Sequence, residues 1–294
     1  MTQPVILCAD DYALAPGVSR AILDLVACGR LSATGCMTVS PFWIDHADWL
    51  RPWADRIDVG LHLTLTDHQP TGPMPRLAPE GRLPPLGRLM RLALTGGLDP
   101  DEISAEIARQ VALFITVFGA PPAFLDGHQH VHLLPVVRDA VVAMAKALPG
   151  SYLRDCREPL PAILHRGVAT TKALVIDRLG SGLARLIKQH HLPANGGFRG
   201  IYDFSNRVPF AELMARFLDP ATPETHSAPP PLVMCHPGLP DPILRRIDPV
   251  TDQRRVEYEF LRSDSFADLL ATQGVTLTRL ALDGDGQSPR RASS

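Results

Sequence analysis

Residues 5–29 read VILCADDYALAPGVSRAILDLVACG, and the pattern within them decides the fold. The apolar run at 5–9 predicts a buried strand, and two aspartates follow it directly. Pro16 then opens a helix-period segment that extends to about Cys28, where Gly29 is placed as a stop. A buried strand followed at once by an amphipathic helix is the repeating unit of α/β proteins.

The same alternation continues along the rest of the chain. Further strands are predicted at 35–39, 59–65, 124–125, 152–153, 232–235 and 275–280, and helices at 44–54, 99–118 and 135–148. The clearest helix has Asp99 at its N-cap and Pro100 in its first turn. Repeated strand-then-helix order predicts a single α/β domain with a parallel sheet, either closed as a barrel or open.

Two stretches do not fit the alternation. Residues 66–98 contain six prolines, too many for a core element, so we expect a loop insertion that forms part of a lid. Residues 283–294 are polar and are predicted to form a disordered tail. The α/β domain is therefore expected to occupy residues 1–282.

The composition excludes several classes of partner. The 294 residues carry a net charge of −2, which gives no electrostatic footprint for nucleic acid or an anionic membrane. Five cysteines without a CxxC pair predict reduced thiols, and the N-terminus has no signal-peptide pattern. No stretch approaches the ~20 apolar residues of a membrane span. We therefore expect a cytoplasmic protein that acts on a small molecule. The sequence is compatible with a homodimer.

Polar residues gather where the predicted strands end. The ends of parallel strands share one edge of an α/β sheet or barrel, and active sites form at that edge. The residues at these positions are Asp10, Asp11, His62, Asp126, His128, His130, His132, Arg154, Asp155, Arg157 and His236. Their convergence from five strands is a stronger signal than any single motif.

Carboxylates together with imidazoles indicate a divalent metal centre. One carboxylate, two neutral imidazoles and open coordination positions are the usual catalytic set. Such a metal activates a water and polarises a carbonyl, while a second carboxylate and a further histidine can move protons. Asp10 and Asp11 enter one site only if the strand ends near Ala9 and the chain turns there, because consecutive strand residues point to opposite faces.

Each of these residues also has an ordinary structural explanation. Asp10 and Asp11 can form a turn or cap the next helix, and His62 can be a hydrogen-bonded core histidine. His236 precedes a Pro-Gly pair and can belong to a plain turn.

The three histidines after the strand at 124–125 alternate along the chain. An extended segment would point His128, His130 and His132 to one side, toward a metal, unless they form a solvated loop. The other histidines receive no role: His46, His68, His165, His190, His191 and His226.

With these residues assembled, the chain resembles the YdjC-like carbohydrate deacetylases. The motifs that carry the resemblance are CADDYALAPGVSRAIL at 8–23, VGLHLTLT at 59–66, FLDGHQHVHLLP at 124–135, LRDCRE at 153–158 and VMCHPG at 233–238. They follow the family's order and span residues 5–280. The resemblance implies an irregular TIM-type β/α barrel. It also implies metal-assisted removal of the acetyl group from an N-acetylated sugar, either chitooligosaccharide-like or glycolipid-like.

The resemblance also implies roles for individual residues. Asp11, His62 and His128 would hold one divalent metal. Asp10 would be the general base, and His236, as imidazolium, the general acid. The substrate-binding or supporting positions would be Arg154, Arg157, His130, His132 and Tyr12. The family is usually assigned magnesium, whereas two imidazoles favour zinc or another first-row ion.

Three other functions fit parts of the pattern. A two-His-one-carboxylate iron oxygenase uses the same ligands but leaves Asp10 without a role. A glycoside hydrolase that uses Asp10 or Asp11 would release sugar rather than acetate. A non-catalytic sugar- or metal-binding protein would not need a base at Asp10.

Overall fold

A computed structural model describes residues 2–219 and 229–280, so the tail predicted at 283–294 lies outside the described residues. Eight strands in this part of the chain pair in parallel within one sheet. They are β1 (Gln3–Tyr12), β2 (Ala33–Cys36), β3 (Asp58–Leu63), β4 (Phe124–Gly127), β5 (Tyr152–Leu153), β6 (Phe198–Arg199), β7 (Leu232–Cys235) and β8 (Val275–Leu277). Their spatial order is β5-β4-β3-β2-β1-β7-β6, and β8 pairs with the beginning of β1.

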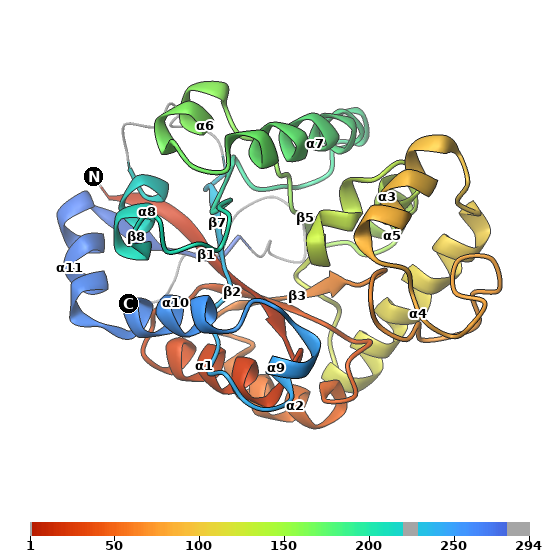
Figure 1. Cartoon of the computed structure of the whole chain (residues 1–294), viewed down its shortest axis with the longest axis horizontal. Coiled ribbons are helices and arrows are strands. Elements are labelled where there is room, and N and C mark those ends of the chain that lie inside the picture. The colour runs from red at the N-terminus through yellow and green to blue at the C-terminus, as the bar shows by residue number, and fades with distance from the viewer. Residues whose placement is uncertain (1, 220–228, 281–294) are drawn as a thin grey trace.

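The sheet curls into an incompletely closed barrel. Leu153 of the outer strand β5 forms one parallel bridge with Ala194, which precedes the other outer strand, β6. Next to it, the backbone N–H of Phe198 donates to the carbonyl of Arg157 at 3.1 Å. Figure 1 shows the strands in the centre with helices around them. The predicted irregular barrel in a single α/β domain is therefore confirmed.

Eleven α-helices in the described residues surround the sheet. They are α1 (Pro16–Ala27), α2 (Trp43–Leu50), α3 (Leu86–Thr95), α4 (Pro100–Phe118), α5 (Val137–Lys146), α6 (Leu160–Arg166), α7 (Thr170–His190), α8 (Phe210–Phe217), α9 (Leu244–Ile247), α10 (Asp252–Arg262) and α11 (Asp264–Gln273). Two 3₁₀ helices, Arg51–Trp53 and His128–Leu133, complete the elements.

Local signals place the ends of two helices as the sequence predicts. The Asp99 carboxylate accepts the N–H groups of Asp101 at 3.0 Å and Glu102 at 3.1 Å, which caps α4. At the end of α1, Gly29 adopts a φ of 68°, a left-handed conformation that costs glycine little.

The 66–98 segment differs from its prediction as a loop without core elements. It contains α3, which buries Leu89 and Ala93 and ends at Gly96 in a left-handed conformation. The many prolines obscure this helix in the sequence. However, Pro85 is its N-cap, where a proline is tolerated, and the amphipathic run LMRLAL begins only beyond it.

Strand boundaries account for most of the remaining differences. Strand β2 lies two residues earlier than predicted, because the chain already turns between Met37 and Ser40. Strand β6 was not predicted, since two residues are too few to show a period. Strand β1 runs to Tyr12 rather than ending at Ala9, which shapes the site described below.

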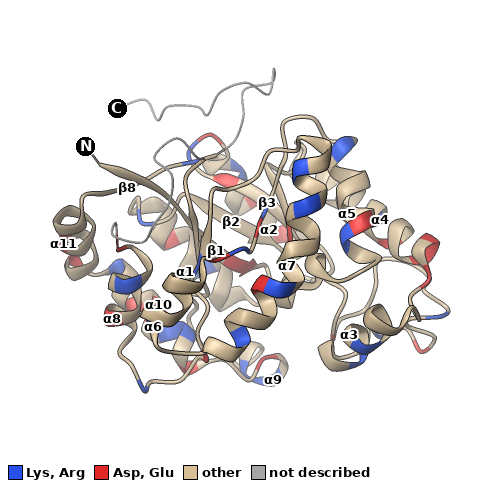
Figure 2. Ribbon diagram, turned by 90° about the horizontal axis from the view of Figure 1, so that it is seen from above, with Lys and Arg blue, Asp and Glu red and all other residues tan. Residues whose placement is uncertain are grey.

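Charged residues of both signs are mixed along the described part of the chain. Figure 2 shows Lys and Arg interspersed with Asp and Glu over the described ribbon. Across residues 2–219 and 229–280, no helix is long and apolar enough to cross a membrane. All five cysteines are free.

Candidate active site

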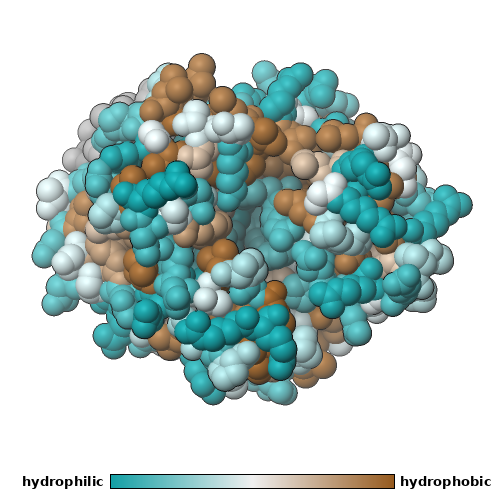
Figure 3. Space-filling model, in the orientation of Figure 1, coloured by the Kyte–Doolittle hydropathy of each residue, from teal (hydrophilic) through white to brown (hydrophobic). Residues whose placement is uncertain are grey.

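A pocket of about 440 Å³ opens beyond the carboxyl ends of the strands. It appears as a hollow with a hydrophilic interior near the centre of the face in Figure 3. Its lining comes from residues far apart in the sequence: Asp10, Asp11, Leu14, His62, Asp67, His68, Arg82, Gly127, His128, Gln129, His130, Phe204, His236, Ile247, Asp248, Pro249, Val250 and Arg254. The predicted residues Asp10, Asp11, His62, His128 and His236 therefore meet in one cavity.

A bulge in β1 brings two consecutive aspartates into this pocket. Ala9 pairs with Thr34 and Tyr12 with Cys36, so Asp10 and Asp11 together lie opposite one residue of β2. Asp11 adopts a φ of 69°, which breaks the usual alternation of strand side chains. The prediction that the strand must end near Ala9 is therefore wrong, because the bulge re-aims the side chain while the strand continues.

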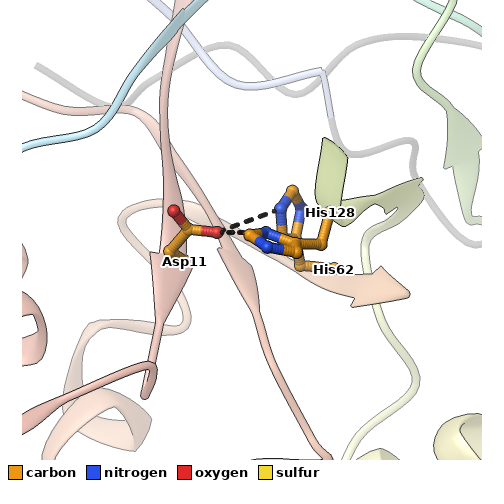
Figure 4. Close-up of side chains that lie close together, drawn as sticks. All are labelled: Asp11, His62 and His128. Carbon is orange, nitrogen blue, oxygen red and sulfur yellow. Dashed lines mark hydrogen bonds and ion pairs between the residues drawn. The ribbon is translucent and has the colours of Figure 1, made fainter. Parts of the chain in front are cut away.

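Asp11, His62 and His128 form a compact cluster (Figure 4). The Oδ1 atom of Asp11 lies 2.8 Å from Nδ1 of His128 and 3.3 Å from Nε2 of His62. The residues come from β1, β3 and the 3₁₀ helix after β4. Gly35 of β2 makes room for His62, since a Cβ atom at this glycine would lie 3.1 Å from the imidazole Nδ1.

The donor set of this cluster fits a divalent cation. His62 pairs its Nδ1 with Oδ1 of Asp126 at 2.8 Å, and its buried Nε2 faces Oδ1 of Asp11 at 3.3 Å without a well-formed hydrogen bond. A histidine whose second nitrogen is held by a carboxylate is typical of metal ligands. Burial alone would lower the pKa of His62, but the carboxylates of Asp126 and Asp10 raise it to about 10. The cluster therefore lies in a field that attracts positive charge.

Arg254 of α10 holds the other oxygen of Asp11. Its guanidinium lies 2.6 Å from Oδ2 of Asp11 and 2.6 Å from Oδ2 of Asp248. Burial would raise the pKa of Asp11, but the charge of Arg254 outweighs it and holds the pKa well below its usual range. Asp11 is therefore ionised, with Oδ1 directed at the two histidines and Oδ2 occupied by Arg254.

Asp10 is held by a different arginine. Both of its oxygens accept hydrogen bonds from Arg154, at 2.6 and 2.7 Å, and the same guanidinium lies 2.6 Å from Oδ2 of Asp126. Burial would raise the pKa of Asp10, but Arg154 keeps it below its usual range. The carbonyl of Arg154 lies 3.2 Å from Nε2 of the buried His132, so this histidine supports Arg154 rather than lining the pocket.

His236 lies beside Asp10 at the end of β7. Its Nε2 is 3.9 Å from Oδ2 of Asp10, and its backbone N–H donates to Glu257 at 2.5 Å. The ring of Phe204 packs edge-to-face on it at 5.0 Å. Burial lowers the pKa of His236 to about 4, although Asp10 and Asp11 oppose the shift. Burial therefore favours the neutral ring at rest, so His236 must gain a proton before it can act as the general acid expected from the sequence.

The three alternating histidines do not share one side. Gln129 and His130 adopt left-handed φ values of 53° and 60°, so the chain turns instead of extending. Only His128 joins the Asp11 cluster, while His130 lines the pocket and His132 is buried behind it. A strand-like period was assumed for these residues, and nothing in the sequence signals the left-handed pair.

Two other predicted residues point elsewhere. The hydroxyl of Tyr12 donates to the carbonyl of His46 at 2.7 Å, inside the core. Arg157 is exposed and pairs with Asp177 of α7 at 2.6 Å. Neither lines the pocket, so their predicted role at the substrate is not supported by their positions.

The structure adds residues that sequence reasoning missed. Arg254 and Glu257 are buried charged residues on α10, one turn apart. His68 received no role, yet it lines the pocket with its ring 6.3 Å from that of His128. Their spacing could have indicated that Arg254 and Glu257 are buried, because they share a helix face with Leu261, which is apolar and buried.

Comparisons with known proteins agree with this geometry. A family model described as YdjC-like protein matches residues 4–272. A chitooligosaccharide deacetylase of Serratia marcescens is 30% identical over 278 residues, covering 94% of this chain and 98% of the relative. The corresponding enzyme of Salmonella paratyphi C is 31% identical over 277 residues, covering 93% of this chain and 96% of its own.

A solved structure from Enterococcus faecalis V583 has the same fold. It is described as a proposed cellobiose-phosphate cleavage protein, and it superposes with a TM-score of 0.71 at 19% identity. The match covers 95% of this chain and 98% of that structure. At this level of identity the likeness concerns the fold alone.

Proposed function

The chain belongs to the YdjC-like family, and from this premise we propose that it is a carbohydrate N-deacetylase, which hydrolyses the acetamido group of an N-acetylated sugar. The observation that carries the proposal is the division of the pocket into a metal-ligand cluster and a proton-transfer pair. Asp11, His62 and His128 form the first, and Asp10 with His236 the second. The relatives from Serratia and Salmonella, described as chitooligosaccharide deacetylases, support the same reaction.

The residues fit a divalent metal, as their donor atoms indicate. Asp11, His62 and His128 would hold it. A cation at this position lowers the pKa of a water and polarises the acetyl carbonyl. Two imidazoles and one carboxylate suit zinc or another first-row ion, and magnesium follows from the family resemblance.

Asp10 is the general base of the proposed reaction. Arg154 positions Asp10 and keeps it ionised, so the carboxylate is in the unprotonated form that a general base requires at neutral pH. The water oxygen forms a bond to the acetyl carbon, and the bond from this carbon to nitrogen then breaks. Acetate leaves, and the sugar keeps a free amine.

His236 returns the proton to the departing nitrogen. Its ring is neutral at rest, so it must first gain a proton, and Asp10 is the nearest acid–base group at 3.9 Å. A proton taken by Asp10 can therefore pass to His236 and then to the amine. Glu257 fixes the backbone of His236 and leaves its imidazole free to face Asp10.

The finer assignments remain part of this proposal. The substrate is chitooligosaccharide-like or glycolipid-like, and the protein acts in the cytoplasm. The proposal is compatible with either a monomer or a homodimer. Residues 66–98 form an insertion within the domain that carries part of the pocket wall.

The proposal is tested by incubating the metal-loaded protein with a panel of N-acetylated sugars. We expect free acetate and an equal amount of free amine, both abolished by a chelator and restored by added metal. Release of reducing sugar without acetate would identify a glycoside hydrolase instead. Turnover that requires oxygen would identify an oxygenase. Binding of sugar without any product would support the non-catalytic alternative.

A further inference from the structure

The 66–98 segment forms an ordered wall of the pocket. Glu106 of α4 accepts the N–H of Thr71 at 2.8 Å and its hydroxyl at 2.9 Å. One turn earlier on the same helix, Glu102 accepts the N–H of Leu77 at 3.0 Å. This wall is therefore fastened to a long helix, and the residues it contributes to the pocket are fixed in position.

His68 is a residue of this wall that lies beside the metal-ligand cluster, with its ring 6.3 Å from that of His128. Its Nδ1 is 3.1 Å from the carbonyl of Thr66, which can only accept, so the proton must be on Nδ1. The Nε2 atom then carries a lone pair. Within residues 2–219 and 229–280 no protein group contacts it by a hydrogen bond, and the ring stands edge-on to His128. Nε2 is an acceptor available to a ligand in the pocket.

The pocket lining also includes apolar side chains. Phe204 follows β6 and packs edge-to-face on His236, and Pro249 and Val250 are other apolar lining residues. Phe204 adopts a φ of 55°, which is uncommon for a bulky residue and directs its ring beside the acid. In the sheet order, β1 separates β3, which leads to His68, from β6, which leads to Phe204. The two residues therefore reach the pocket from different strands of the sheet.

A pyranose ring has complementary chemistry: its hydroxyls form the edge and its C–H groups form apolar faces. We propose that the pocket holds the sugar ring against both residues, with Nε2 of His68 accepting a hydrogen bond from one ring hydroxyl and Phe204 packing on a C–H face. Placed polar groups fix the orientation of a bound ligand and give a pocket its specificity. This inference rests on the proposed function and adds the orientation of the ring to it.

The test compares wild type with His68→Ala on N,N′-diacetylchitobiose and on analogues that each lack one hydroxyl. We expect His68→Ala to lower kcat/KM on the parent sugar by about 3- to 10-fold, mainly through KM, because one neutral hydrogen bond is lost. On the analogue that lacks the hydroxyl bound by His68, the two proteins should be equal. Metal content should not change. His165→Ala, which removes an exposed histidine on α6, is the matched control.

Phe204 gives the complementary result. Phe204→Ala should lower kcat/KM on every analogue by a similar factor, since stacking does not depend on one hydroxyl, and Phe204→Tyr should restore it. An equal loss on all analogues for His68→Ala, or no loss at all, overturns the inference.

A separate measurement distinguishes failure of the proposed sugar orientation from failure of the deacetylase proposal. If wild type releases no acetate, saturation-transfer NMR of the same sugars still measures binding. Binding that depends on His68 and on one hydroxyl would support the proposed sugar orientation and overturn the deacetylase proposal. Acetate release without that dependence would support the deacetylase proposal and overturn the proposed orientation. Absence of both binding and release would overturn both.

Discussion

Asp10 and Asp11 are neighbours in the chain, yet their carboxylates belong to separate charge networks, with Arg154 on Asp10 and Arg254 on Asp11. The bulge in β1 allows this separation, because it directs both side chains into the pocket while each carboxylate pairs with a different arginine. Each arginine outweighs the effect of burial on the carboxylate it binds. Two ionised carboxylates can therefore lie side by side and take different roles.

The first prediction separates these roles by replacing each carboxylate with an amide. Asp11→Asn should lose most of its metal affinity, since an amide oxygen is a poorer ligand than a carboxylate. Asp10→Asn should keep the metal and the fold but lose about 10²–10⁴ in turnover, the usual contribution of a general base. Metal stoichiometry and acetate release on both variants provide the measurement.

Two outcomes would contradict the assignment. Full activity in Asp10→Asn would remove its role as base. Retention of metal in Asp11→Asn would place the cation elsewhere, for example on the second cluster of possible ligands formed by Asp10, His62 and Asp126.

The second prediction concerns Arg254, whose contact with Oδ2 of Asp11 orients the carboxylate toward the histidines. Arg254→Gln should weaken metal binding by about 10- to 100-fold, as is typical when the group that orients a ligand is removed. Loss of this positive charge leaves Asp248 without its partner and makes the field more attractive to a cation, so a weaker affinity would show that orientation outweighs the change in charge. Titration with Zn²⁺ or Mn²⁺ measures the affinity. Arg255→Gln, on the exposed side of α10, is the control and should bind normally.

The third prediction uses the pKa of Glu257, which burial raises to about 7 despite hydrogen bonds from Tyr202 and His236. Between the usual carboxyl pKa and about 7, the folded protein holds a proton that the unfolded chain has released. Stability conferred at low pH is therefore lost as pH rises through this window. Relative to Glu257→Gln, wild type should lose about 3 kcal/mol of unfolding free energy between pH 5 and pH 8.

Urea unfolding of both proteins across this pH range measures the difference. Glu259→Gln, exposed on the same helix, should run parallel to wild type. Parallel curves for wild type and Glu257→Gln would mean that Glu257 stays ionised in the folded protein at all these pH values.

The sequence is informative where buried strands end in polar residues. The strand ends gathered eleven polar residues at one edge, the family resemblance selected Asp11, His62 and His128 among them, and the structure brings these three within reach of one ion. Strand period alone could not place the side chains, since Asp11 reaches the site through a bulge and His130 is separated from His128 by a left-handed turn.

Sequence reasoning missed residues that are buried although their side chains are charged. Arg254 and Glu257 are charged, and charged residues are rarely buried without partners, so the sequence offered no reason to place them in the site. Their partners, Asp11 and the backbone of His236, are distant in the chain and come together only in the folded barrel. His68 was missed because the proline-rich segment around it has no helix or strand periodicity that would indicate where its side chain points.

The last prediction concerns His236, which we place as the group that protonates the departing amine. His236→Ala should retain its metal, since the imidazole is not one of the clustered ligands. It should slow deacetylation by about 10²–10⁴, the range expected for a positioned general acid. The loss should shrink on an acetyl ester with an activated alcohol, because such a leaving group departs without a proton. Comparing the two substrates on wild type and variant separates proton transfer from binding, and His165→Ala controls for loss of an imidazole. An equal loss on amide and ester would assign His236 to substrate binding or to the packing of Phe204 instead.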